Sequence, residues 1–456
     1  MPTTVNPATE AELATYDRLS DGALDGALDD ALARAADAFE SHRQSGFAER
    51  AENMRRLADL LDDGADDHAA LMTAEMGKPI DQAVAEAKKC AWVCRYYAEH
   101  AEAFLADEPH ETEAARSFVA YEPLGPVLAV MPWNFPFWQA FRFAAPTVMA
   151  GGVGVLKHAE NVLGCGERMA ALFREAGFAE GVFQHVAIDH DQTADVIADD
   201  RIRAVTLTGS ERAGRAIGKA AGEALKPSVL ELGGTDAFVV LADADLDAAV
   251  ETGVKARVQN NGQSCIAAKR FILEAPIAEA YTRRFVERME ALTVGDPTGD
   301  VDLGPLARAD LRDDVQDQVE RAVADGAEVL TGGRIPKGTG FFYPPTVLGN
   351  VMEGTVAFDE EIFGPVASLT VADDADDAVR LANETRFGLG GSVWTADRDR
   401  GERIARQIRS GAVFVNEMTK SHPNLPFGGI GVSGYGRELA RHGIRAFVNA
   451  KTIWVD

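Results

Sequence analysis

The strongest constraint on the fold of this chain is a repeated alternation of short apolar segments with helical segments. Runs such as "GPVLAVM" (125–131), "VGVLKH" (153–158) and "AVTLTGS" (204–210) are each followed by apolar residues at three- and four-residue spacing. A glycine-bounded buried strand followed by a helix is the repeating unit of a parallel, doubly wound sheet. A second alternating stretch covers roughly residues 235–420, so we predict an α/β fold with two lobes and a ligand cleft between them.

Other elements are predicted on either side of this alternating region. Residues 29–107 have the apolar spacing of amphipathic helices. The segments "ARSFVAYE" (115–122) and "IRAFVNAKTIWVD" (444–456) have the pattern of an edge strand and a terminal strand. We expect these two segments to pair in a small sheet that reaches a neighbouring subunit.

The charge of the chain limits its partners. It carries 45 basic and 72 acidic residues, a net charge of −27, and such a surface repels nucleic acids and anionic membranes. No apolar run is long enough to cross a bilayer, and the N-terminal sequence lacks the features of a signal peptide. The four cysteines have no disulfide spacing. We therefore expect a cytoplasmic protein with no nucleic-acid or membrane partner.

Cys265 is the candidate nucleophile. It lies in "QNNGQSCIAAKR" (259–270), a polar stretch typical of a turn, and Lys269 follows it closely. A thiolate requires positive potential nearby, whereas most free cysteines only fill space in a core. The local sequence leaves both interpretations equally open. Cys90 and Cys94 lie four apart on one helix face, where a metal pair is conceivable, but no histidine or second cysteine pair completes a site, so helix packing is the favoured interpretation. Cys165 is interpreted as structural, and the nine histidines have no metal-ligand spacing, so we predict no metal site.

Two further motifs supply groups that a nucleophile needs. Glu231 ends an apolar strand in "VLELGGTD", where a carboxylate facing a cleft is a candidate general base; the alternative is an exposed loop glutamate. Asn134 in "VMPWNFPFW" follows another strand, where a fixed amide is a candidate donor to an oxyanion; the alternative is a turn-forming asparagine beside proline.

Seven motifs in this order resemble those of the aldehyde dehydrogenase superfamily over essentially the whole chain. They are "PWNFP", "LKHAEN", "TGSERAG", "LELGG", "GQSC", "EEIFGPV" and "PFGGIGVSGYGRE". The resemblance implies a Rossmann-type NAD-binding domain (1–229, with an oligomerisation strand near 112–122) and an α/β catalytic domain (230–424). The remaining segment (425–456) would complete the substrate loop and a small β oligomerisation extension, giving a homodimer or homotetramer.

The resemblance also implies a mechanism for the oxidation of an aldehyde. The thiolate of Cys265 would attack the aldehyde carbonyl, and the Asn134 amide and the Cys265 N–H would hold the oxyanion. After hydride transfer to a nicotinamide, Glu231 would activate water to hydrolyse the thioester. Relatives that pass the acyl group to coenzyme A typically lack this glutamate, so the expected product is a free carboxylate.

The cofactor residues follow from the same resemblance. Lys157 and Glu160 match positions that take the adenosine ribose, and a carboxylate there repels a 2′-phosphate, so we predict NAD, with NADP as the alternative. A Gly-Ser turn before a helix binds phosphate, although by itself it is most often a helix cap. The remaining cofactor positions implied by the resemblance are Trp133, Thr208, Gly209, Ser210, Gly214, Leu232, Glu361 and Phe363.

Two residues match positions that bind the distal carboxylate in the succinate-semialdehyde dehydrogenase branch. They are Arg142 and Ser421, whose alternative interpretations are a surface or interface arginine and a plain loop serine. Many members of the branch have an additional arginine where this chain has Gln259. We predict succinate semialdehyde as the substrate. The alternatives are glutarate semialdehyde, glycolaldehyde or lactaldehyde, or a non-catalytic binding protein of the same fold.

The acidic composition generates a prediction about salt. The chain has only 11 lysines against 34 arginines, and acidic, lysine-poor surfaces suit a high-salt cytoplasm. Because molar salt screens charge repulsion beyond about 3 Å, activity and melting temperature should rise between low and molar KCl. Full stability without added salt would contradict this interpretation.

Overall fold

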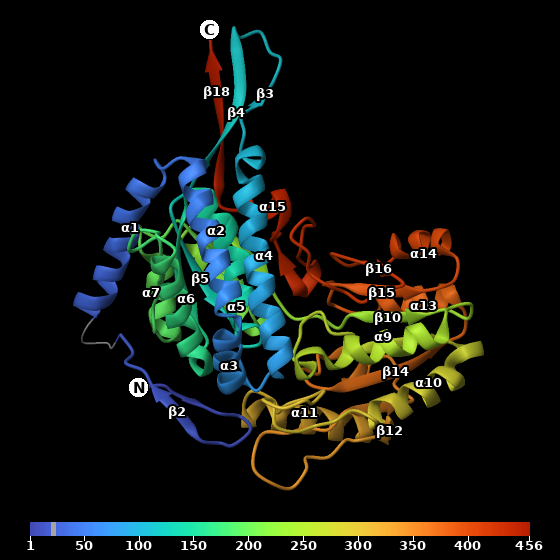
Figure 1. Ribbon diagram of the computed structural model, residues 1–456. Helices are drawn as coiled ribbons and strands as arrows, with labels where there is room; N and C mark the ends of the chain where they lie inside the picture. Colours follow the sequence, from blue (N-terminus) through green and yellow to red (C-terminus); the bar gives the residue numbers. More distant parts are fainter. Residues whose placement is uncertain (20–23) are drawn as a thin grey trace.

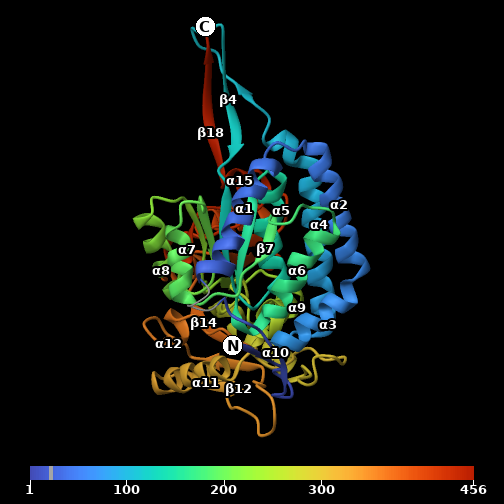
Figure 2. The same ribbon diagram turned by 90° about the vertical axis from the view of Figure 1, so that its left-hand side faces the viewer.

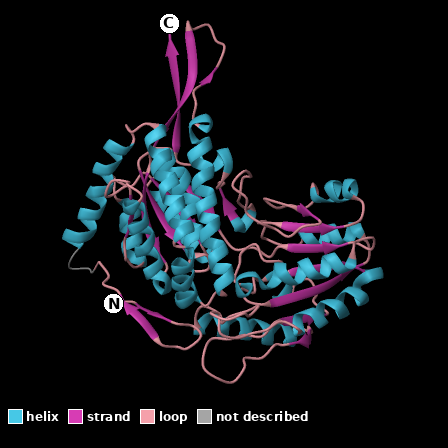
Figure 3. Ribbon diagram, viewed as in Figure 1, coloured by secondary structure: helices cyan, strands magenta, loops and turns pink. Residues whose placement is uncertain are grey.

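The protein consists of two α/β lobes and a narrow β arm that projects from one of them (Figure 1, Figure 3). The computed structural model describes residues 1–19 and 24–456. Within this described part of the chain, no helix is long and apolar enough to span a membrane.

The first lobe is built on a six-stranded sheet of order β17-β9-β8-β5-β6-β7, parallel except for β17. This confirms the predicted doubly wound sheet. Its strands are β5 (Pro126–Met131), β6 (Val153–His158), β7 (Phe183–His185), β8 (Ala204–Thr208), β9 (Ser228–Glu231) and β17 (Gly434–Tyr435). The alternating helices are α5 (Pro136–Met149), α6 (Leu163–Glu175), α7 (His190–Ala198) and α8 (Glu211–Glu223).

The predicted N-terminal helices form an additional layer on this lobe (Figure 2). The amphipathic pattern over residues 50–77 belongs to two helices that meet at Gly64. Cys90 and Cys94 are fully buried on a long helix, where they pack against their neighbours. The helices are the short η1 (Leu24–Leu28), α1 (Asp29–His42), α2 (Phe47–Asp63), α3 (Ala65–Met76) and α4 (Ile80–Phe104). Two short strands, β1 (Thr3–Val5) and β2 (Glu12–Thr15), precede them as a hairpin that the sequence did not predict.

The second lobe has a seven-stranded sheet of order β12-β13-β14-β11-β10-β15-β16, parallel except for β12, as the second alternating stretch predicts. Its strands are β10 (Ala237–Val240), β11 (Arg270–Glu274), β12 (Glu328–Thr331), β13 (Thr346–Gly349), β14 (Val366–Ala372), β15 (Gly391–Trp394) and β16 (Phe414–Val415). Its helices are α9 (Leu246–Val258), α10 (Ala275–Glu290), α11 (Ala309–Ala324), α12 (Val356–Asp359), α13 (Ala375–Asn383) and α14 (Arg398–Ala405).

The arm consists of the two segments that the sequence predicted to pair. Strand β18 (Val448–Val455) runs antiparallel to β4 (Arg116–Pro123) over its whole length, and β4 also pairs with the short β3 (Glu108–Pro109). The strand expected near 112–122 therefore begins at Arg116. The short helix α15 (Ala440–Arg445) leads into β18 from the first lobe.

A buried ion pair fixes α4 against α5. Glu86 on α4 pairs with Lys78, and the Lys78 side chain is fully buried. The other carboxylate oxygen of Glu86 accepts hydrogen bonds from the backbone N–H groups of Phe137 and Trp138, each at 2.9 Å. These are orphan donors at the N-terminus of α5, where a negative charge is favourable. One carboxylate therefore satisfies both a buried ammonium and a helix terminus.

Replacing this carboxylate by an amide should destabilise the fold strongly. The Glu86→Gln substitution leaves the buried Lys78 ammonium without a counter-charge, which typically costs about 3–5 kcal/mol of unfolding free energy. Urea denaturation and melting temperature measure this loss. The matched control is Glu99→Gln, at an exposed position of the same helix, which should change stability by less than about 0.5 kcal/mol. Equal effects of the two substitutions would contradict the assigned role of Glu86.

Candidate active site

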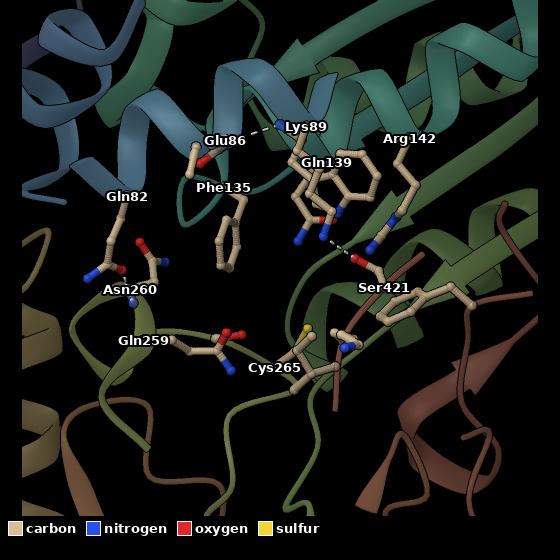
Figure 4. A pocket seen from close by; sticks show the side chains of 16 residues that line it. Gln82, Glu86, Lys89, Phe135, Gln139, Arg142, Gln259, Asn260, Cys265 and Ser421 are labelled. Atoms are coloured by element: carbon tan, nitrogen blue, oxygen red, sulfur yellow. Dashed lines mark hydrogen bonds between the residues drawn. The ribbon is translucent and has the colours of Figure 1, made fainter. Parts of the chain in front are cut away.

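Two cavities meet at the side chain of Cys265. The first has a volume of about 240 Å³ and is lined by α4, α5 and the loops around Cys265 and Ser421 (Figure 4). Most of its lining surface is apolar, and we call it the polar cavity after the charged and amide side chains among its lining residues. The second, which we call the strand-end cavity, has a similar volume of about 240 Å³ and lies where β5, β8 and β9 end. Cys265 and Gln139 line both, so the thiol is accessible from two sides.

The segment before Cys265 has an unusual backbone. Asn260, Asn261 and Gly262 have φ angles of 54°, 58° and 74°, three consecutive residues in the left-handed region. Asparagine and glycine tolerate this region better than other residues. A Cβ atom on Gly262 would also collide with the backbone of Gly364. The turn predicted here is therefore present, and its sequence suits its backbone.

The Asn261 side chain anchors this turn to the segments around Gly77 and Pro305. Its amide donates to the carbonyl oxygens of Gly77 and Pro305, each at 2.8 Å, and its oxygen accepts the N–H of Gly304 at 2.8 Å. Asn261 is fully buried. Three hydrogen bonds to segments distant in sequence thus fix the position of the turn.

Asn134 and Asn260 anchor the turn to the segment that follows β5. The Asn260 amide donates to the carbonyl oxygens of Asn134 (2.7 Å) and Gln263 (2.9 Å). The Asn134 amide also donates to the Gln263 carbonyl, at 3.1 Å. An amide nitrogen carries two hydrogens. Because Asn134 lines the strand-end cavity beside Cys265, one N–H of this fixed amide can serve a ligand oxygen.

Lys269 is buried beneath the nucleophile segment. Its Nζ donates to the carbonyl oxygens of Ser264 (2.9 Å) and Cys265 (2.8 Å), and it forms an ion pair with Glu361 at 3.2 Å. Glu361 also accepts the N–H of Gly234 at 3.1 Å. The Lys269 charge is therefore not solvated. Its ammonium binds the backbone carbonyl groups on both sides of the Cys265 Cα atom, and its charge acts on the thiol.

The thiol of Cys265 is neutral at rest. Burial raises its pKa to about 12, although the positive charges of Lys269 and Arg142 act in the opposite direction. A neutral thiol is a weak nucleophile, since the thiolate is the reactive species. Attack on a carbonyl from this state requires that a base remove the proton.

Glu231 is the general base that the sequence indicated, but it lines neither cavity in this structure. It is the last residue of β9 and buried rather than in an exposed loop, and its side chain points toward Gly428. Burial and then the neighbouring Glu438 raise the pKa of Glu231 well above its usual range. No described residue hydrogen-bonds either carboxylate oxygen. Only a change of rotamer would bring this side chain toward Cys265.

The strand-end cavity contains most of the predicted cofactor residues. Thr208, Gly209 and Ser210 lie at the turn from β8 into α8, and the Ser210 hydroxyl accepts the N–H of Ala213 at 3.3 Å as a helix cap. Gly214, on the first turns of α8, faces Leu232 so closely that a Cβ atom would lie 2.5 Å from it.

Aromatic and acidic side chains complete this cavity. The rings of Trp133 and Phe363 stand edge to face with centroids 5.8 Å apart, and Glu361 lies on the same wall. An apolar cleft with a helix N-terminus at one end suits a ring system that carries phosphates. These residues therefore fit a nicotinamide dinucleotide.

Three predicted cofactor positions, Gly214, Lys157 and Glu160, line neither cavity. Lys157 is near the end of β6 and is buried, and burial lowers the pKa of its ammonium. Glu160 forms an ion pair with Arg18 at 2.5 Å. Arg18 belongs to the N-terminal segment, and the sequence did not single it out.

The polar cavity brings the predicted substrate residues together. Arg142 is buried rather than on the surface: it pairs with Glu438, donates to the Thr208 hydroxyl at 3.3 Å and lies over the Phe427 ring. Ser421 lines the same cavity and is also buried.

Sequence analysis noted Lys269 beside Cys265 but missed two further charged residues near this site, Lys89 and Glu438. Lys89 lies three residues after the buried Glu86 and four before the buried Val93. This spacing places it on the buried face of α4 and is the signal that would have identified it.

Comparisons with known proteins agree with this geometry. The aldehyde dehydrogenase family profile matches residues 2–453. A probable NADP(+) succinate-semialdehyde dehydrogenase of Synechocystis sp. is 51% identical over 453 residues, covering 99% of each chain. An NADP(+) succinate-semialdehyde dehydrogenase of Mycobacterium tuberculosis is 51% identical over 456 residues, again covering 99% of each.

Solved structures give the same result. The crystal structure of succinic semialdehyde dehydrogenase from Streptococcus pyogenes in complex with NADP+ superposes with a TM-score of 0.97, at 36% identity and over 100% of both chains. An NAD-dependent aldehyde dehydrogenase from Sinorhizobium meliloti superposes with a TM-score of 0.96 at 34% identity, covering 100% of this chain and 91% of the other. The chain therefore belongs to the aldehyde dehydrogenase family and is an oxidoreductase that acts on aldehydes.

Proposed function

We propose that this enzyme oxidises succinate semialdehyde to succinate with a nicotinamide dinucleotide as the acceptor. The observation that carries the proposal is the position of Cys265, which lines a small cavity with cationic walls on one side and the strand-end cavity on the other. Relatives at 51% identity bear the name of this activity. A small, positively lined cavity suits an aldehyde with a carboxylate at its far end.

In the proposed reaction, the Sγ atom of Cys265 bonds to the aldehyde carbon after its proton is removed. The side-chain amide of Asn134 and the backbone N–H of Cys265 then donate to the oxyanion. The chemistry that the cofactor supplies is acceptance of the hydride lost from this carbon, which leaves a thioester on Cys265. Glu231, after a rotamer change toward the thioester, takes a proton from the water that hydrolyses it.

We infer that the cofactor preference is set at Glu160. A carboxylate accepts hydrogen bonds from both ribose hydroxyls and repels a 2′-phosphate, which favours NAD. The pairing of Glu160 with Arg18 weakens that repulsion, and Lys157 adds a further positive charge nearby. Use of NADP as a second acceptor is consistent with both observations and with the cofactor named for the relatives.

We also propose a homodimer or homotetramer in the cytoplasm. The support is the outer edge of β18, which leaves a strand of eight residues unpaired on one side within the described chain. Such an edge is suited to pairing with another copy. The proposed domain division (1–229, 230–424 and 425–456) accords with the two sheets, although β9 carries the first sheet as far as Glu231.

Turnover of an aldehyde panel tests the proposed function. With NAD or NADP in excess, absorbance at 340 nm should rise faster with succinate semialdehyde than with butanal, glycolaldehyde or lactaldehyde. The Cys265→Ala variant should lose at least about 10⁴-fold in rate, as expected for removal of a covalent nucleophile. The Glu231→Gln variant should release one equivalent of reduced cofactor per active site and then slow, because the thioester accumulates.

The matched control is Cys94→Ala, which removes a buried thiol from α4 away from both cavities. This variant should keep its activity within about threefold if it remains folded. Absence of turnover with every aldehyde would favour a binding protein of the same fold. Faster turnover of an uncharged aldehyde would replace the proposed substrate.

A substitution at Glu160 tests the cofactor proposal. Glu160→Ser removes the carboxylate and leaves Arg18 and Lys157 free to face a 2′-phosphate, so the ratio of kcat/KM for NADP to that for NAD should rise at least about tenfold. The control is Glu180→Ser, which removes an exposed carboxylate that pairs with Arg34. An unchanged ratio in the Glu160 variant would contradict this assignment.

A further inference from the structure

Lys89, a half-buried residue, places its ammonium in the polar cavity. It lies on α4, and its side chain points into the cavity toward Ser421 (Figure 4). The Nζ atom lies 4.3 Å from the centroid of the Trp138 ring and donates to the Ser421 hydroxyl at 2.8 Å. Burial and then the charge of Arg142 lower the pKa of Lys89 to about 8.

This ammonium has no carboxylate partner among the residues that the structure describes. Its one hydrogen-bond acceptor there is the neutral Ser421 hydroxyl, although an ammonium has three N–H donors. The nearest acid on the same helix face, Glu86, is already bound to Lys78 and to the N-terminus of α5. A buried charge without a counter-ion is unfavourable, so the part of the cavity that Lys89 lines suits an anion.

Arg142 lines the same cavity, but unlike Lys89 it has a carboxylate partner. It is paired with Glu438, which compensates its charge inside the protein. Ser421 uses an oxygen lone pair to accept from Lys89, and its own O–H remains available to donate. Within the polar cavity, the uncompensated positive charge and a free hydroxyl donor therefore lie at the same place.

We propose that Lys89, together with the Ser421 hydroxyl, binds the distal carboxylate of the substrate and selects short ω-carboxy aldehydes over uncharged ones. This inference rests on the proposed function and assigns its specificity to a residue beyond the Arg142–Ser421 pair. One carboxylate oxygen accepts from the Lys89 ammonium and the other from Ser421 O–H. Arg142 then contributes as a charge held by Glu438 rather than as the main ligand.

The position of Lys89 also favours short substrates. Cys265 and Lys89 line one cavity of about 240 Å³. A substrate whose aldehyde carbon contacts Cys265 while its carboxylate contacts Lys89 must therefore be short. Gln259, which lines this cavity where many relatives have an arginine, supplies no charge. The anionic end is therefore directed to the α4 side of the cavity, where Lys89 enters.

The test compares two four-carbon aldehydes, succinate semialdehyde and butanal, which differ by the terminal carboxylate. In Lys89→Met, the ratio of their kcat/KM values should fall by about tenfold to a hundredfold, because a hydrogen bond to a charged group is lost. The loss should appear mainly as a higher KM for succinate semialdehyde. Succinate should also become a weaker competitive inhibitor of butanal oxidation, whereas butyrate should change less.

The matched control is Lys88→Met, which removes the adjacent lysine on the exposed side of α4. It has the same charge change and should leave the aldehyde ratio within about twofold. Melting temperature reports whether each variant is folded. If Lys89→Met does not fold, Lys89→Gln serves in its place, since it keeps a polar end in the cavity while removing the charge.

The outcomes separate this inference from the proposed function. A wild-type preference for succinate semialdehyde that survives in the Lys89 variant overturns the inference and leaves the proposed function intact. A wild-type preference for glutarate semialdehyde over pentanal that is lost in the variant replaces the proposed substrate and supports the inference. A wild-type enzyme with no preference for carboxylate-bearing aldehydes overturns both.

Discussion

The structure of the active site depends on the backbone of the turn that precedes Cys265. Three consecutive left-handed residues, 260–262, are held there by buried side-chain amides rather than by secondary structure. Asn261 bonds the segments around Gly77 and Pro305, and Asn260 bonds Asn134. Each of these acceptors belongs to a different part of the chain. The nucleophile is therefore positioned only when both lobes and the N-terminal helices have come together.

Several buried charges at and near the site are compensated by a bonded partner. Lys269 is bound to backbone carbonyls and to Glu361, Arg142 to Glu438, and Lys78 to Glu86. Burial would otherwise disfavour each of these charges. The pairing leaves Lys89 as the cation that is open to a ligand in the polar cavity. Burial of Glu231, and then the neighbouring Glu438 carboxylate, raise the pKa of Glu231 above that of an ordinary glutamate.

Much of the fold could be predicted because strands and helices differ in apolar period. Strand β6 was predicted to the residue, and the pairing of β4 with β18 followed from two isolated strand patterns. The motifs located Asn134 and the turn at Ser210 because each lies between a strand and the following helix, and they located Cys265 because it lies in a polar turn between helix α9 and strand β11. The hairpin β1–β2 was missed, since its short, mostly exposed strands carry little apolar pattern. Partners such as Glu438 and Arg18 were missed because ion pairs join segments far apart in sequence.

Burial of the thiol has a further consequence, for the chemical durability of the enzyme. Peroxides and alkylating agents attack cysteine through its thiolate, so susceptibility follows the fraction of thiol that is ionised. A resting pKa near 12 keeps that fraction very small at neutral pH. Cys265 can thus remain open to two cavities while only a small fraction of its thiol is in the ionised form that oxidants attack. The protein retains its reactive sulfur in a protected form until a substrate is bound and a base removes the proton.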